Sequence, residues 1–138
     1  MRSISSLVAV ATLVACSDAF KPTTENVIGD YQPLTFTIDS AGTSRDLLAA
    51  GASLDLLLLP FGEAVGQLNV PGDTAMAFVS LNGSWTLTGN TVRFTQTADT
   101  FVRDMDWVAG KDRLSGDKTF GDVRVRIVLK RLPGPSLP

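Results

Sequence analysis

Residues 84–95 read Ser-Trp-Thr-Leu-Thr-Gly-Asn-Thr-Val-Arg-Phe-Thr, and this stretch decides the fold. The Gly-Asn dipeptide at its centre tolerates the positive φ angles of a two-residue β-hairpin loop. When the chain folds back about this dipeptide, Trp85 faces Phe94 and Leu87 faces Val92. Because side chains alternate between the two faces of a strand, these large apolar groups share one face and the polar groups share the other. The stretch therefore predicts an antiparallel pair with one buried side and one solvated side.

The same alternation recurs along the chain, with short turn signals between the segments. Besides the hairpin, we expect strands within residues 27–38, 53–59, 65–70, 75–81, 101–108, 113–116 and 123–132. Pro33 lacks a ladder N–H, which predicts a bulge or an edge in the first strand. Consecutive hairpins with regular turns predict an all-β fold, an antiparallel up-and-down barrel of about eight strands over residues 27–132. We expect residues 133–138 to be a disordered tail.

The composition excludes several classes of function. The chain of 138 residues contains no histidine and one cysteine, and its formal net charge is −2. Without histidine it cannot form a Ser-His-Asp or Cys-His catalytic site, and most zinc and copper sites are excluded. One cysteine allows no internal disulfide, and the acidic balance argues against a nucleic-acid partner. We therefore expect a single domain that is not an enzyme and needs no cofactor.

The first fifteen residues have the composition of a secretory signal. A short positive start, Met1-Arg2-Ser3, is followed by a largely apolar run over residues 4–15. A membrane-spanning helix needs roughly 20 apolar residues, so this run is too short to span a bilayer. It ends in Leu13-Val14-Ala15-Cys16, which resembles the lipobox of bacterial lipoproteins. The aliphatic residue, the small residue and the thiol stand in the positions that this family uses.

The resemblance implies that residues 1–15 are a lipoprotein signal peptide and that Cys16 becomes the acylated N-terminus, held in the bilayer of the bacterial cell envelope. Several acyl chains anchor a protein firmly, at about 0.8 kcal/mol per buried methylene. Ser17 after the cysteine implies the outer membrane if the source has two membranes. The alternative is an ordinary signal peptide with Cys16 lost or free. Residues 16–26 are polar and aperiodic, which predicts a flexible tether.

The ends of the barrel segment carry a second resemblance. Gly29 and Tyr31 open the first strand and Arg131 closes the last, a pattern similar to that of lipocalins. In that family the arginine packs across the aromatic residue at the closed end of the barrel, although the aromatic residue is usually tryptophan and the domain is longer. The resemblance implies a lipocalin-like barrel. Such a barrel either holds one small ligand or is filled by its own side chains.

Two carboxylates, Asp104 and Asp106, fall on one face of the expected strand 101–108. Two strand steps separate them by about 6.6 Å, near the spacing used in glycoside hydrolysis, and the pair also suits calcium. The simpler interpretation is a solvated outer face neutralised by Arg124 and Arg126 on a neighbouring strand. A lone carboxylate pair identifies neither chemistry.

The opposite face of that expected strand contains Arg103 between apolar residues. An arginine there must be paired, stacked on a ring, or placed at the barrel mouth, where it is either structural or grips a ligand carboxylate or phosphate. With Trp85, Trp107, Phe94 and Met105 it forms the candidate ligand site, whereas aromatic core is the simpler role for the two tryptophans.

Together these features predict a membrane-anchored envelope lipoprotein whose barrel binds, without catalysis, a small apolar or amphiphilic ligand or an envelope partner. The alternative is a structural or interaction domain with a filled barrel and no ligand. An enzyme would need carboxylates from separate strands converging in a cleft.

Overall fold

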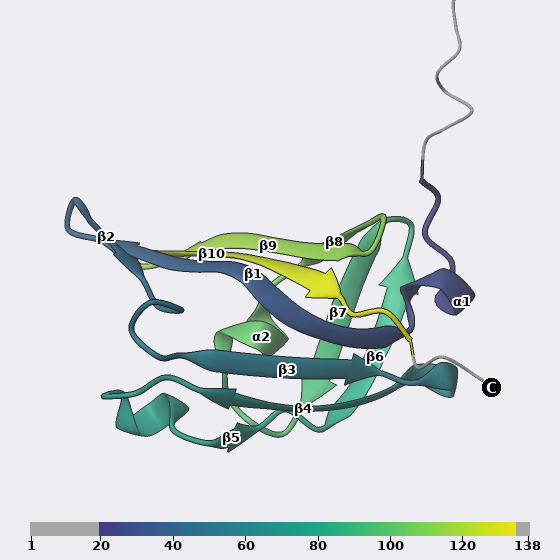
Figure 1. The fold of residues 1–138 in the computed structure, drawn as a ribbon, viewed down its shortest axis with the longest axis horizontal. Coiled ribbons are helices and arrows are strands. Elements are labelled where there is room, and N and C mark those ends of the chain that lie inside the picture. Colours follow the sequence, from purple (N-terminus) through teal and green to yellow (C-terminus); the bar gives the residue numbers. More distant parts are fainter. Residues whose placement is uncertain (1–19, 135–138) are drawn as a thin grey trace, which may run out of the picture.

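The computed structural model describes residues 20–134 (Figure 1). The expected signal peptide, the acylation site at Cys16 and residues 135–138 lie outside this range. None of the helices within it is long and apolar enough to cross a membrane. The elements in chain order are α1 (Thr24–Val27), β1 (Gly29–Ser40), β2 (Thr43–Asp46), β3 (Ser53–Leu58), the 3-10 turn η2 (Pro60–Gly62), β4 (Glu63–Asn69), the 3-10 turn η3 (Thr74–Met76), β5 (Val79–Ser80), β6 (Gly83–Thr88), β7 (Thr91–Gln96), α2 (Phe101–Asp104), β8 (Trp107–Gly110), β9 (Arg113–Phe120) and β10 (Val123–Arg131).

The strands form a closed antiparallel barrel. Eight strands follow one another around it in the order β1, β3, β4, β6, β7, β8, β9 and β10, and β10 pairs with β1 to close the ring. The short strands β2 and β5 extend this sheet beside β1 and β4. Closure satisfies the backbone groups that an open sheet would leave unpaired at its edges. The predicted all-β, up-and-down, lipocalin-like barrel is confirmed.

The hairpin that predicted the fold has the expected register. Trp85 pairs with Phe94 and Leu87 pairs with Val92, across a turn in which Gly89 has a φ of 61°. The expected irregularity in β1 is also present, because the pairing with β10 shifts between Pro33 and Thr35. The missing N–H of proline accounts for this bulge.

The segment after β7 differs from its prediction. We expect one strand over residues 101–108, but the chain forms the helical turn α2 over Phe101–Asp104 and becomes a strand only at Trp107. Thr100 precedes the helix in an extended conformation, and Val102 is fully buried. Apolar residues at 101, 102 and 105 also fit helical spacing, so a short run of this kind does not separate the two periods.

The last residues of the expected tether are part of the folded domain. Thr23 caps α1 in a reciprocal capping box, in which its hydroxyl accepts from the N–H of Asn26 and its own N–H donates to the Asn26 side chain. Such a box satisfies donors that a helix start otherwise leaves open. The barrel domain therefore begins before residue 27.

Candidate functional site

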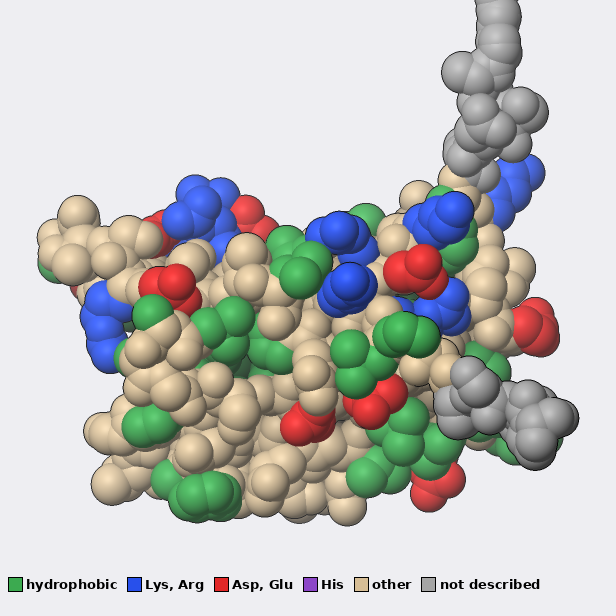
Figure 2. All heavy atoms as spheres, in the orientation of Figure 1, with side chains coloured by type: hydrophobic (Ala, Val, Ile, Leu, Met, Phe, Trp, Pro, Cys, Tyr) green, Lys and Arg blue, Asp and Glu red, His purple; other side chains and the backbone are tan. Residues whose placement is uncertain are grey.

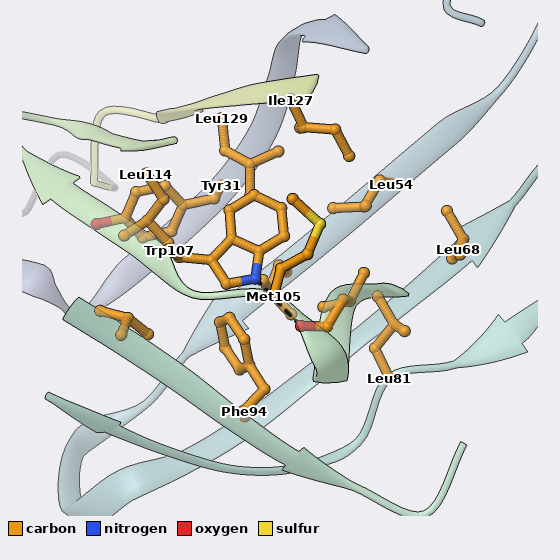
Figure 3. Close-up of a cluster of buried hydrophobic side chains, with 14 of the residues drawn as sticks. Tyr31, Leu54, Leu68, Leu81, Phe94, Met105, Trp107, Leu114, Ile127 and Leu129 are labelled. Carbon is orange, nitrogen blue, oxygen red and sulfur yellow. Dashed lines mark hydrogen bonds between the residues drawn. The ribbon is translucent and has the colours of Figure 1, made fainter. Parts of the chain in front are cut away.

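The interior of the barrel is filled with side chains around Trp107 (Figure 3). Trp107 and Met105 have no exposed surface, and the ring of Phe94 meets the indole edge-on with centroids 6.3 Å apart. The indole N–H donates to the carbonyl oxygen of Val102, 3.1 Å away. Opposite the indole is Gly116, where an added Cβ would lie 2.5 Å from Met105 Cε and 3.1 Å from the indole ring.

Three of the predicted ligand residues are part of the packed interior. Phe94, Met105 and Trp107 face the centre of the core, where they contact other side chains of the barrel. Protein interiors packed in this way leave few voids larger than a water molecule. The site expected inside the barrel is therefore not open at these three residues.

Arg103 lies on α2 and is paired with acidic neighbours, because the segment is helical and not extended. Its guanidinium contacts Asp99 Oδ1 at 2.6 Å and Asp104 Oδ1 at 2.9 Å, and the side chain is 33% exposed. The hydrogen bond from Arg103 lowers the pKa of Asp104, and the same bond raises the pKa of Arg103. The structure thus places Arg103 in a local acidic cluster, separate from Trp107 in the core.

The two carboxylates expected on one strand face are held by different arginines. Asp104 binds Arg103 on α2, whereas Asp106 lies beyond the helix and binds Arg93 of β7 at 2.8 Å. The arginines expected to neutralise them have other partners, since Arg124 binds Asp117 and Arg126 binds Asp39. Within residues 20–134, no three acidic or cysteine side chains gather where they could hold a metal ion.

The three residues of the lipocalin-like pattern meet at one end of the barrel. Tyr31 pairs with Arg131 across β1 and β10, and the Arg131 side chain lies against Gly29, where a Cβ would be 2.5 Å from its Cδ. Arg131 Nη1 donates to the carbonyl oxygens of Asn26 at 2.7 Å and Ile28 at 3.1 Å, and its guanidinium also binds Asp112.

The same network fixes α1. The Tyr31 hydroxyl donates to the carbonyl oxygen of Val27 at 2.7 Å, and burial raises the pKa of Tyr31 to about 12. Helix C-termini leave carbonyl groups unsatisfied, and here a tyrosine and an arginine from the barrel satisfy them. These hydrogen bonds hold α1 against the end of the barrel.

An apolar groove of about 590 Å³ opens beside α1, between α1, η2 and β6. Its volume falls within the range of small-molecule sites, which combine apolar walls with a few polar groups. Its lining is largely apolar, and the charged group in it is Glu25. The residues are Thr24, Glu25, Ile28, Pro60, Phe61, Gly62, Trp85, Thr86 and Leu87.

Trp85 is the only residue of the predicted ligand set that lines this groove. It is 4% exposed, and its indole N–H donates to the carbonyl oxygen of Leu59 at 2.9 Å, which ties β6 to the turn η2. The rest of the groove was missed from sequence, because it combines three segments that are distant along the chain. The one local signal was the turn at Pro60-Phe61-Gly62, which presents an aromatic side chain between two turn residues.

Comparison with known proteins adds no family to this geometry. No family model matches the chain, and the comparisons with curated proteins and with solved structures found no match.

Proposed function

We propose that the protein is a lipid-anchored envelope lipoprotein, attached through acylated Cys16, whose barrel binds a small amphiphilic molecule without transforming it. The groove between α1, η2 and β6 is the proposed binding site, in place of the barrel interior. The observation that carries this proposal is an apolar groove of about 590 Å³ beside an interior filled by Trp107 and its neighbours.

The lining of the groove also supports a class of ligand. Its walls are the side chains of Ile28, Pro60, Trp85 and Leu87, which suit an alkyl chain. The acidic side chain of Glu25 is exposed and lies at the same groove. Because like charges repel, a fatty acid is the least favoured amphiphile, and an amine or a neutral headgroup is preferred.

The proposal that the protein is not an enzyme rests on side-chain chemistry. The chain has no histidine, and the pKa of Asp104 is lowered by Arg103, which disfavours it as a proton donor near neutral pH. General acid-base catalysis works best with groups whose pKa lies near the working pH.

A binding titration tests the groove directly. The probes are a long-chain amine, a long-chain alcohol and a fatty acid of equal chain length, each added below its micelle concentration. We expect saturable binding of one molecule per chain, with the amine bound as well as or better than the alcohol and the fatty acid bound worst. Absence of binding for all three probes, measured by calorimetry and native mass spectrometry, would contradict the proposed ligand site.

Two threonines of β6 supply matched variants. Thr86 and Thr88 are both exposed on the same strand face, but only Thr86 lines the groove. We expect Thr86→Arg to fill the groove and weaken binding at least tenfold, whereas Thr88→Arg leaves binding unchanged. Equal loss in both variants would show that the effect comes from added charge and not from the groove.

The anchoring is tested separately, by growing the source organism with labelled palmitate. We expect label on the wild-type chain and none on Cys16→Ser. An unlabelled wild-type chain would overturn the lipoprotein assignment while leaving the groove to be judged by its own titration.

The second candidate function is a structural or interaction domain that binds no small molecule. The filled interior favours it, because side chains of the barrel occupy the space that an internal ligand would need. Failure of all three amphiphiles together with confirmed acylation of Cys16 would support this candidate over the first.

A further inference from the structure

Phe61 is the most exposed of the large apolar side chains within residues 20–134. Its relative exposure is 106%, and its backbone lies in the left-handed region with a φ of 66° and a ψ of 20°. That conformation is unfavourable for a residue with a Cβ and is usually occupied by glycine, asparagine or aspartate. Neither burial nor local conformation explains phenylalanine at this position.

The turn around Phe61 is held firmly. The N–H of Leu59 donates to the carbonyl oxygen of Glu63 at 2.8 Å, and the carbonyl oxygen of Leu59 accepts from the Trp85 indole at 2.9 Å. The ring of Pro60, the residue before Phe61, restricts the φ angle of Pro60 itself. The phenyl ring is therefore exposed on a turn that these hydrogen bonds hold.

Residues 20–23, the first described part of the chain, precede α1 at this same end (Figure 1). The groove joins α1 to η2, and Arg131 and Tyr31 hold α1 in place. Seven residue steps separate Cys16 from Thr23, the cap of α1. A chain of that length reaches at most about 25 Å when fully extended. A lipid attached to Cys16 therefore keeps the end that contains Phe61 near the bilayer.

Both acidic and basic side chains lie at the α1 end of the barrel. Lys21, Lys111 and Lys130 form no ion pair within the described part of the chain. Several basic side chains lie at this end of the molecule in Figure 2. Glu25 and Glu63 lie at the same end. Because the acidic residues offset part of the basic charge, the apolar ring is the main feature that suits a bilayer.

Phe78 shows that an exposed phenylalanine at positive φ is not by itself a membrane contact. It is 72% exposed with a φ of 51°, and it lies at the opposite end, where its N–H donates to Asn69 at the end of β4. What distinguishes Phe61 is its place at the groove beside α1, the first described element after Cys16 in the sequence.

We propose that the end of the barrel formed by α1 and η2 docks on the bilayer that holds Cys16, with the ring of Phe61 inserted at the lipid interface. This inference rests on the acylation proposed above. It adds an orientation, in which the groove opens toward the lipid surface and the α2 end faces away from it.

The test compares Phe61→Trp with Phe78→Trp in the full, naturally processed protein. Each is reconstituted into phosphatidylethanolamine–phosphatidylglycerol vesicles that contain lipids brominated near the headgroup, which quench tryptophan on contact. The wild-type protein gives the background from Trp85 and Trp107, which are 4% and 0% exposed. We expect strong quenching and a blue-shifted emission for tryptophan at position 61, and background quenching for tryptophan at position 78.

Equal quenching at both positions, no quenching at either, or stronger quenching at position 78 would each overturn the docking proposal. The intact mass of the same sample reports the acyl chains on Cys16 independently. If that mass shows none, the lipoprotein assignment fails, and a maleimide-phospholipid coupled to the Cys16 thiol supplies the anchor. The same comparison of positions 61 and 78 then decides the docking proposal on its own.

Discussion

The two ends of the barrel are closed by different kinds of interaction. At the α1 end, Arg131 and Tyr31 donate to main-chain carbonyl oxygens of the entering segment, and Asp112 neutralises the arginine. At the α2 end, closure is apolar, because Val102 is fully buried and Phe101 packs on Phe36 with ring centroids 5.6 Å apart. The polar closure fixes α1 and lies beside an apolar groove, whereas the apolar closure is part of the core.

The largest expected effect comes from the core that both closures share. Trp107→Ala removes the central indole and its hydrogen bond to Val102, and we expect a loss of about 3–5 kcal/mol in the free energy of unfolding. Trp107→Phe keeps part of the volume and costs less. Urea unfolding measures both, and a loss below about 1 kcal/mol for Trp107→Ala would contradict a filled barrel.

The polar closure has the next largest expected effect. Arg131→Met leaves the carbonyl oxygens of Asn26 and Ile28 and the carboxylate of Asp112 without their donor. We expect a loss of about 2–3 kcal/mol by urea unfolding, because unsatisfied and charge-assisted hydrogen bonds are costly. Arg113→Met, at an exposed position without an ion pair in the described residues, serves as the control. Equal stability of the two variants would show that the arginine network does not hold this end.

High pH weakens the same end through Tyr31. Burial raises its pKa from 10.0 to about 12, so between these values the unfolded chain loses the phenol proton before the folded chain does. Stability contributed by the neutral phenol is therefore present below pH 10 and is lost as pH rises to 12, with a loss of about 2 kcal/mol. Tyr31 is the only tyrosine, so phenolate absorbance reports its titration directly. In Tyr31→Phe this part of the pH dependence should disappear; if it persists, another group is responsible.

The smallest effect on stability is expected at the two exposed phenylalanines. Asparagine tolerates left-handed backbone better than phenylalanine does, so Phe61→Asn and Phe78→Asn should each leave stability unchanged or raise it by up to about 1 kcal/mol. Thermal unfolding measures both. A loss above about 1 kcal/mol in either variant would show that the ring at that position stabilises the fold.

The sequence predicted features that depend on alternation and on a single turn. The pairing of Trp85 with Phe94 follows from the period of a strand and a two-residue loop, and the bulge near Pro33 follows from the missing N–H. It did not predict α2, because a short apolar run fits a helix as well as a strand. Nor did it predict β2, whose four residues, Thr43–Asp46, are all exposed and carry no apolar alternation.

The candidate site was less predictable than the fold. Of the three environments expected for Arg103, the structure shows the paired one, because in α2 its side chain binds Asp99 and Asp104. The groove depends on how α1, η2 and β6 meet in space, and single-sequence periodicity does not contain that information. The sequence signals for it are Trp85, which belongs both to the hairpin and to the groove, and the turn at Pro60-Phe61-Gly62.

The most direct test of the account measures the fluorescence of the two tryptophans, one in the groove and one in the core. In Trp107→Phe the remaining Trp85 lines the groove, and in Trp85→Phe the remaining Trp107 lies in the core. A long-chain amine brominated on its alkyl chain is added to each variant, with Thr86→Arg introduced into both as the blocked control. We predict saturable quenching of Trp85 that the Thr86→Arg change abolishes, and no quenching of Trp107. Stronger quenching of Trp107 than of Trp85 would place the ligand inside the barrel and contradict the account.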